Sequence, residues 1–117
     1  MKFGSREIGE GCPAYIIAEM SANHNGDFQK AAEMVHAAKE AGADAVKIQT
    51  YTADTITLRS DKKYFKIESG TIWDGATLHD LYQKACTPWE WQPRLKEIAD
   101  GIGIELFSSP FDFTAVD

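Results

Sequence analysis

Three polar strand ends are the part of this 117-residue sequence best suited to chemistry. One short apolar segment ends on Glu19, and a second carries Lys47 and Gln49 at its end. A third ends on Ser108 and Ser109. In sheets covered by helices, the carboxyl ends of parallel strands meet at one edge, where the loops form a ligand site. We therefore expect these polar side chains to lie close to one another.

Lys47 is the most versatile of these groups. A lysine at a strand end can bind phosphate as a point charge, or form a Schiff base with a carbonyl compound if its pKa is depressed. Because side chains alternate along a strand, Lys47 and Gln49 share one side, while Val46 and Ile48 face the other. The alternative for Lys47 is an ion pair in solvent, which the apolar neighbours disfavour.

The other two strand ends carry weaker signals. Glu19 could bind a ligand or could simply cap a loop amide. Ser108 and Ser109 offer two hydroxyls and a loop amide, which suit a phosphate oxygen. Serine before proline is also common in turns, so the Ser109-Pro110 pair alone is not specific.

The first loop contains Asn23, His24 and Asn25. His24 could bind a metal or donate a proton, but no second histidine is spaced to share a metal with it. We therefore expect a hydrogen-bonding role for His24 and predict no metal site in this chain. His36 and His79 fall on expected helices and are interpreted as surface or packing residues.

The first half of the chain predicts one strand-helix-strand unit. Residues 2–12 predict a short hairpin or irregular lead-in, and residues 14–19 a strand. Asp27 is placed to cap a helix that begins near Phe28, and Gly42 to end it in a left-handed conformation. Apolar residues at helical spacing should face the sheet: Ala31, Met34, Val35, Ala38 and Ala41. A second strand follows at residues 45–49, and such a unit is right-handed with parallel strands.

The second half repeats the rhythm after a long connection. Residues 51–77 show no clear structure, and their scattered aromatic residues indicate that they fold over something. A helix is expected at 78–86. Thr87, Pro88 and Glu90 then have the types and spacing of a capping box that starts the next helix, which runs to about Gly101. Residues 104–108 predict a third strand, followed by a turn toward a third helix.

This pattern predicts an α/β fold. Alternating strands and helices are typical of the eight-stranded TIM barrel, which takes about 250 residues. We expect residues 1–117 to form the first three βα units of such a barrel, preceded by a short hairpin, with the remaining strands absent. A small doubly wound domain is the alternative.

Composition excludes several classes of protein. The net charge is −6 and there is no cluster of lysine and arginine, which argues against a nucleic-acid surface. No signal peptide or membrane-spanning apolar segment is present, so a cytoplasmic protein that does not contact membranes is expected. Cys12 and Cys86 belong to no paired-cysteine motif and are expected to be reduced.

Four segments together resemble the opening of the sialic acid synthases, enzymes that condense phosphoenolpyruvate with an amino sugar. The segments are residues 17–19, 23–26, 41–50 and 107–111. Residues 19–24, 73–75, 82 and 87–91 are most similar to the branch of the family that uses a 2,4-diacetamido-2,4,6-trideoxyhexose of the altrose series. The resemblance covers nearly the whole chain.

The resemblance implies a metal-dependent barrel and roles for individual residues. Lys47 would bind phosphoenolpyruvate, Ser109 would contact its phosphate, and Glu19 would hold sugar hydroxyls, so Glu19 and Lys47 are the expected catalytic pair. Gln49, Asn23 and His24 are expected as further substrate contacts. A divalent metal such as manganese is expected in the full-length enzyme, with its ligands and a C-terminal antifreeze-like domain outside this chain. A homodimer is expected for that enzyme.

Three alternatives stay open. One is a synthase for N-acetylneuraminate or legionaminate, and a more distant one is a Schiff-base aldolase that uses Lys47. The third is a non-catalytic fragment that associates through the exposed edge of its third strand, since the 117 residues alone lack most of the barrel.

Overall fold

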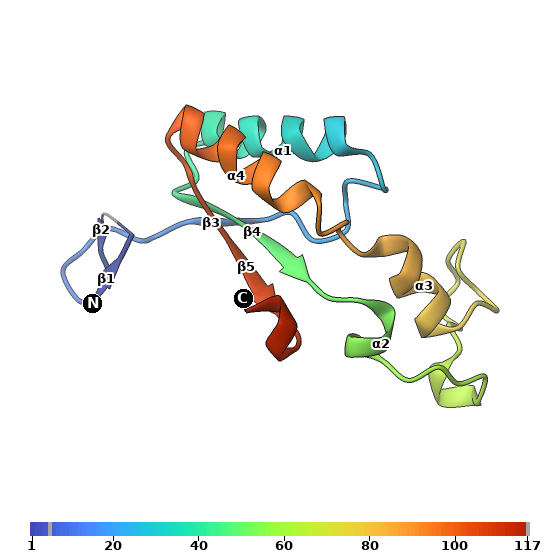
Figure 1. Ribbon diagram of the computed structural model, residues 1–117. Helices are drawn as coiled ribbons and strands as arrows, with labels where there is room; N and C mark the ends of the chain where they lie inside the picture. Colours follow the sequence, from blue (N-terminus) through green and yellow to red (C-terminus); the bar gives the residue numbers. More distant parts are fainter. Residues whose placement is uncertain (5, 117) are drawn as a thin grey trace.

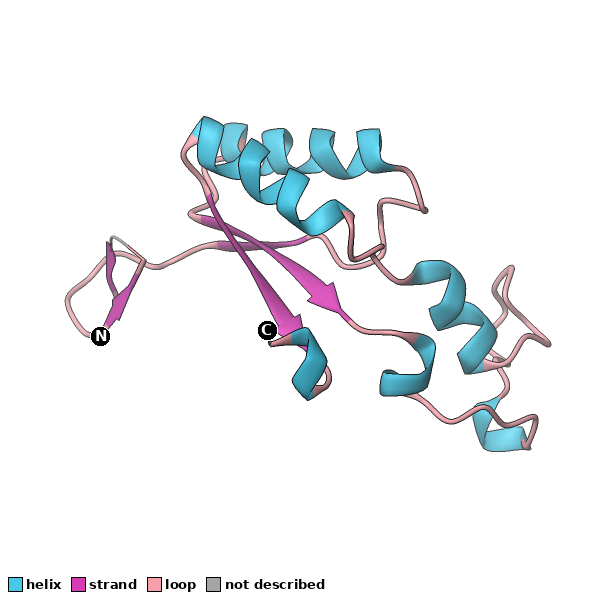
Figure 2. Cartoon of the chain, viewed as in Figure 1, coloured by secondary structure: helices cyan, strands magenta, loops and turns pink. Residues whose placement is uncertain are grey.

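The computed structural model describes residues 1–4 and 6–116 and shows a parallel sheet with helices packed on one face (Figures 1 and 2). The sheet has the order β3 (Ile17–Glu19), β4 (Ala45–Thr50) and β5 (Glu105–Pro110). Both neighbouring pairs are parallel. The first strand is shorter than expected, because it begins at Ile17 rather than at Ala14. This sheet belongs to the α/β class that the sequence predicts.

Helix α1 (Phe28–Glu40) joins β3 to β4 and has the predicted ends. The Asp27 carboxylate accepts hydrogen bonds from the backbone N–H groups of Gln29 and Lys30. Gly42 follows the helix with φ 84°, a conformation that costs glycine little. Local chemistry therefore determines both ends of this helix.

The main core lies between the sheet and two helices, α1 and α4 (Trp91–Ile102). Its fully buried members come from all three layers: Ala31, Val35, Val46, Ile48, Leu95 and Ala99. Small residues on α1 allow the helix to lie close to the sheet, as the sequence indicates. Ala41, expected in the same apolar stripe, is exposed because the helix ends before it.

Both helices cover the same face of the sheet and pack against each other. A barrel places all its helices on the outside, whereas a doubly wound sheet carries them on both faces. The three-stranded parallel sheet therefore fits part of a barrel. After β5, the chain forms a short 3₁₀ helix, η2 (Phe113–Ala115), where the sequence suggested the start of a third α-helix.

The N-terminal hairpin is present at the amino ends of the strands. Strands β1 (Lys2–Phe3) and β2 (Arg6–Glu7) pair antiparallel, and Ser5 lies outside the described residues. The Phe3 ring contacts Tyr15 and Phe107 edge-on, with 5.3 Å between ring centroids in each pair. An ion pair between Arg6 and Asp44 adds to this contact.

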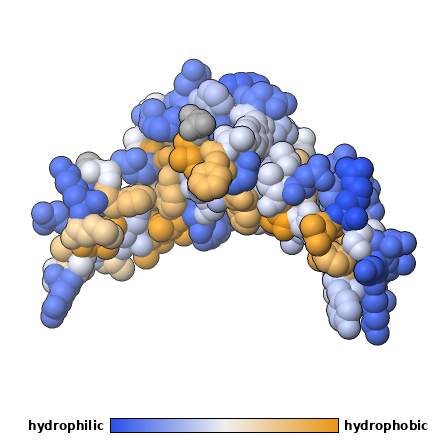
Figure 3. Space-filling view, turned by 60° about the horizontal axis from the view of Figure 1, so that its bottom comes forward, coloured by the Kyte–Doolittle hydropathy of each residue, from blue (hydrophilic) through white to orange (hydrophobic). Residues whose placement is uncertain are grey.

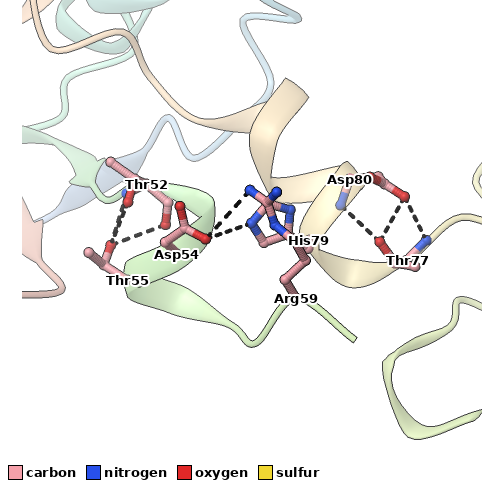
Figure 4. A network of polar contacts seen from close by, with 7 residues as sticks. All are labelled: Thr52, Asp54, Thr55, Arg59, Thr77, His79 and Asp80. Carbon is pink, nitrogen blue, oxygen red and sulfur yellow. Dashed lines mark hydrogen bonds and ion pairs between the residues drawn. The ribbon is translucent and has the colours of Figure 1, made fainter. Parts of the chain in front are cut away.

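The long connection is more structured than its sequence predicts. It contains helix α2 (Ala53–Ile56) and a 3₁₀ helix, η1 (Lys63–Phe65), and leads into α3 (Leu78–Ala85). These elements form an arm, residues 53–85, that projects from the sheet (Figure 1). His79 on α3 is almost fully buried and its Nε2 lies 2.9 Å from Asp54 Oδ1 on α2, which links the two helices (Figure 4). This hydrogen bond lowers the pKa of Asp54.

Two further sequence expectations concern single features. Cys12 and Cys86 are free thiols, as predicted. Among the described residues, no helix is both long and apolar enough to span a membrane.

Candidate functional site

The candidate site is the face of the sheet that the helices leave uncovered, at the carboxyl ends of the strands. The pairing register places Glu19, Lys47 and Phe107 side by side on β3, β4 and β5. Two residues further on, Gln49 lies beside Ser109. Side chains two positions apart on a strand share a face. The structure thus brings together four of the predicted site residues: Glu19, Lys47, Gln49 and Ser109.

Lys47 and Glu19 form an ion pair across the first two strands, with 2.7 Å between Lys47 Nζ and Glu19 Oε1. The Lys47 side chain is 27% exposed and that of Glu19 is 57% exposed. The ion pair considered as the alternative for Lys47 is therefore present, and it lies within the candidate site. Because Glu19 is more open than its partner, an anion can approach Lys47 and compete with this carboxylate.

Gln49 is held by a residue that the sequence did not single out. The Ser21 hydroxyl donates to Gln49 Oε1 at 3.5 Å, and Ser21 has φ 50°. A non-glycine residue in this region is uncommon and marks a constrained loop. Since the Gln49 oxygen is engaged, its amide nitrogen is the group that can donate to a ligand. Nothing in the sequence indicates the backbone conformation of Ser21.

The two serines at the end of β5 separate onto opposite faces. Ser108 Oγ lies 2.6 Å from Thr50 Oγ1, which also accepts a hydrogen bond from Gln92 Nε2 on α4 at 2.9 Å. Ser108 therefore belongs to the helix-covered face, and only Ser109 faces the candidate site. The expectation of two hydroxyls at this strand end is wrong, because β5 continues through Pro110 and keeps the alternation of a strand.

His24 lies inside the protein, away from the open face. It is completely buried, its Nδ1 accepts from the Gly26 backbone N–H at 3.1 Å, and its Nε2 lies 3.0 Å from Thr87 Oγ1. Burial lowers the pKa of this imidazole. The expected hydrogen-bonding role is confirmed. Both ring nitrogens are used internally, so in this structure neither faces the open side of the sheet, where His24 was predicted to contact substrate.

Helix α4 begins later than the sequence predicts. Thr87 was expected to cap this helix with Pro88 and Glu90, yet the helix begins at Trp91 and Glu90 makes no side-chain capping bond. The Thr87 hydroxyl is instead the partner of His24. The spacing of Thr87 fits a capping box, and no local pattern indicates this tertiary contact.

Asn23 precedes the buried histidine in the first loop. Its side chain is exposed, and Nδ2 donates to the Met20 carbonyl at 3.0 Å. This bond orders the loop and leaves the amide oxygen as the group that can accept from a ligand. Asn23 is therefore at the edge of the site rather than within the row of strand residues.

The uncovered side is partly apolar. Figure 3 shows apolar surface along the hollow between the hairpin and the arm. Ile17, on the same side of β3 as Glu19, is 42% exposed, and Phe111, just beyond β5, is 39% exposed. In a barrel this face lines the interior, with the polar strand ends at its mouth.

A metal would need ligands other than those described. Residues 1–4 and 6–116 contain no group of three His, Cys, Asp or Glu side chains that could hold a metal ion. The Glu19 carboxylate alone does not make such a site.

The chain is similar to known proteins over most of its length. Over 97 residues, 83% of its length, the chain is 54% identical to the pseudaminic acid synthase of Campylobacter jejuni, of which it spans 28%. It is 38% identical over 114 residues to the N,N'-diacetyllegionaminic acid synthase of Legionella pneumophila, 97% of this chain and 32% of that protein. The crystal structure of N-acetylneuraminic acid synthetase from Leptospira borgpetersenii superposes with a TM-score of 0.78 at 28% identity, covering 99% of this chain and 35% of that one.

The model of the NeuB family matches residues 34–117, which include β4, β5 and the candidate residues Lys47, Gln49 and Ser109. This match covers well over half of the chain, and the relatives extend the similarity to Glu19 and the first loop. The chain belongs to the NeuB family.

Proposed function

We propose that the protein containing this chain condenses phosphoenolpyruvate with a 2,4-diacetamido-2,4,6-trideoxyhexose of the altrose series, giving pseudaminic acid and phosphate. The observation that carries the proposal is the Lys47–Glu19 pair on the uncovered face, one strand away from Ser109. The identity to a pseudaminic acid synthase, 54% against 38% for the legionaminic acid enzyme, supports this choice of sugar.

The reaction joins two carbons and releases phosphate. The methylene carbon of phosphoenolpyruvate attacks the aldehyde carbon of the open-chain sugar, and the aldehyde oxygen gains a proton. Water adds at the neighbouring carbon of phosphoenolpyruvate, and the bond between that carbon and the bridging oxygen breaks. Phosphate leaves with both bonding electrons, and the former enol carbon becomes the keto carbon of the product.

Lys47 and Ser109 suit the phosphoenolpyruvate end of this reaction. Phosphoenolpyruvate is highly anionic, and the ammonium group of Lys47, on a side chain that is 27% exposed, offers it a charge-assisted hydrogen bond. The Ser109 hydroxyl, on the neighbouring strand, can donate to a phosphate oxygen. Gln49 is opposite Ser109 in the register and two positions after Lys47, and it can donate its amide N–H.

Glu19 suits the sugar end because binding of phosphoenolpyruvate at Lys47 would free its carboxylate. In the structure its carboxylate is occupied by Lys47. The phosphate group of phosphoenolpyruvate would displace the Glu19 carboxylate from Lys47. The carboxylate could then accept hydrogen bonds from sugar hydroxyls. The ion pair therefore favours binding of phosphoenolpyruvate before the sugar.

From the family resemblance, we also propose that the full-length protein binds a divalent metal and forms a homodimer. Such a metal would polarise the sugar aldehyde when bound. Its ligands would have to come from residues other than those described.

Legionaminic or N-acetylneuraminic acid synthesis is the alternative within the same reaction class, because relatives carry those names. The choice of sugar separates these possibilities. Each sugar in turn would be offered with phosphoenolpyruvate and manganese to the full-length gene product, and phosphate release would be measured.

We expect phosphate release with the altrose-series sugar. Lys47→Met should raise the KM for phosphoenolpyruvate at least tenfold, which corresponds to the loss of about 1.4 kcal/mol of binding. The control is Lys30→Met, which removes an exposed lysine from α1, outside the site. Absence of phosphate release with every sugar, or equal effects of the two lysine variants, would refute the proposal.

A further inference from the structure

A second concavity lies beside the candidate site, between the loop that follows β3 and helix α3 of the arm. Its volume is about 290 Å³. The lining is formed by Ala22, Asn25, Trp73, Leu81, Lys84 and Ala85. Small-molecule pockets have volumes of about 300–1,000 Å³, so this cavity lies at the small end of that range.

The loop of residues 20–26 connects this cavity to the candidate site. On one side Ser21 donates to Gln49, and on the other side Ala22 and Asn25 line the cavity. A molecule held at the strand ends can therefore extend across this loop into the cavity.

Trp73 is the largest wall of the cavity and sits on a preorganised turn. The Asp74 carboxylate accepts from the backbone N–H groups of Ser69, Gly70 and Thr71, each at 3.1 Å. Backbone bonds between Ile67 and both Gly75 and Ala76 close the base of this loop. The indole is half-buried, and these bonds order the backbone that carries it.

Lys84 supplies the cation of the cavity. Its Nζ lies 5.6 Å from the centroid of the Trp73 ring, a distance at which the ring face attracts a cation. Leu81 and Ala85, on the same helix, extend the apolar wall. Asn25 contributes an amide from the opposite side.

The lining matches an acetamido substituent. An apolar methyl group can pack on the indole, Leu81 and Ala85, and the amide oxygen can accept a hydrogen bond from Lys84. The amide N–H can donate to the oxygen of Asn25. Because the sugar aldehyde must react near Lys47, a group that reaches this cavity lies away from the reacting end.

We propose that this cavity binds the acetamido group at carbon 4 of the sugar, and that Trp73 and Lys84 determine specificity for it. The inference rests on the proposed function for the identity of the sugar. It adds a binding pocket outside the row of strand-end residues.

The test compares two sugars with the full-length gene product: the 2,4-diacetamido altrose-series sugar and its analogue with a hydroxyl at carbon 4. Saturation-transfer NMR measures contact of each acetyl methyl group with the protein, in the presence of inorganic phosphate, which cannot condense with the sugar. We expect strong saturation of the carbon-4 methyl, reduced severalfold by Trp73→Ala and unchanged by Trp89→Ala, which removes a tryptophan outside the cavity. Trp73→Phe should restore most of the signal, which a folding defect would not allow.

Kinetics give an independent measure. Loss of a well-packed apolar contact changes kcat/KM by about 10- to 200-fold, so Trp73→Ala should lower kcat/KM by at least tenfold for the diacetamido sugar only. Lys84→Met should act in the same direction, with Lys30→Met as its control. Equal losses for both sugars, or a carbon-4 methyl that is not saturated in the wild type, would overturn the inference. If the wild type turns over neither sugar, the proposed function fails, and the NMR comparison still decides whether the cavity binds the acetamido group.

Discussion

Protonation of His24 should control the pH dependence of folding stability. The imidazole is completely buried, with Nδ1 accepting from Gly26 N–H and Nε2 facing the Thr87 hydroxyl. A second proton on Nδ1 would break the Gly26 bond and place a charge in an apolar site. This is why burial lowers the pKa of His24 from its ordinary value of 6.5.

The sign and size of the effect follow from proton linkage. Below pH 6.5 the unfolded chain binds a proton at His24 that the folded protein excludes. The free energy of unfolding therefore falls as the pH is lowered, by at most about 1.4 kcal/mol per pH unit from this single group. The contribution of neutral His24 is complete above pH 6.5 and is lost progressively below it.

Urea unfolding at several pH values between 7.5 and 5 would measure this slope, using the full-length protein. His24→Gln should be less stable at neutral pH but should lack the His24 part of the slope. His36→Gln is the matched control, because it removes a histidine that is exposed on α1 rather than buried. If His24→Gln keeps the wild-type slope, or His36→Gln abolishes it, the assignment of a buried neutral imidazole is wrong.

Three other variants test local features of the fold. Thr87→Val should cost about 1–3 kcal/mol at pH 7, because it leaves His24 Nε2–H without its acceptor, and urea unfolding measures this loss. Gly103→Ala should lower the free energy of unfolding by about 1 kcal/mol, since Gly103 ends α4 with φ 70°. Gly101→Ala, within the same helix, should instead raise the free energy of unfolding by about 0.5–1 kcal/mol. If both changes act in the same direction, the left-handed conformation of Gly103 does not explain its effect. Asp74→Asn should speed hydrogen exchange at the backbone amides of Ser69, Gly70 and Thr71, because it removes the charged carboxylate that accepts their hydrogen bonds. The same bonds lower the pKa of Asp74, so they are kept until the pH falls below the ordinary value of 3.8. Unchanged exchange would show that the carboxylate does not order the turn.

Features set by neighbouring residues could be predicted from the sequence. Asp27 and Gly42 mark the ends of α1 because a cap needs only the backbone beside it. Strand alternation likewise placed Lys47 and Gln49 on one face, because the period of two holds wherever a strand continues. The same rule would have separated Ser108 from Ser109 if the third strand had been extended to Pro110.

Features set by distant partners could not be predicted. Thr87 has the right neighbours for a capping box, but its hydroxyl pairs with His24, 63 positions earlier in the chain. The arm shows no long apolar periodicity, and the link between Asp54 and His79 that joins its helices spans 25 positions. Contacts between residues so far apart in the chain cannot be predicted from local spacing.

The contrast between Glu19 and His24 shows what decides whether a polar residue can serve the site. Both belong to the same short strand-loop segment, and both residue types suit catalysis. Glu19 is the last residue of a strand, so its direction is fixed by the register with Lys47. His24 lies in a loop, where the backbone allows either direction, and its two internal hydrogen bonds outweigh exposure to solvent. The loop is therefore held from within by His24 while Ser21 and Asn23 remain at its outer side, which makes His24 a support for the site rather than a contact of the substrate.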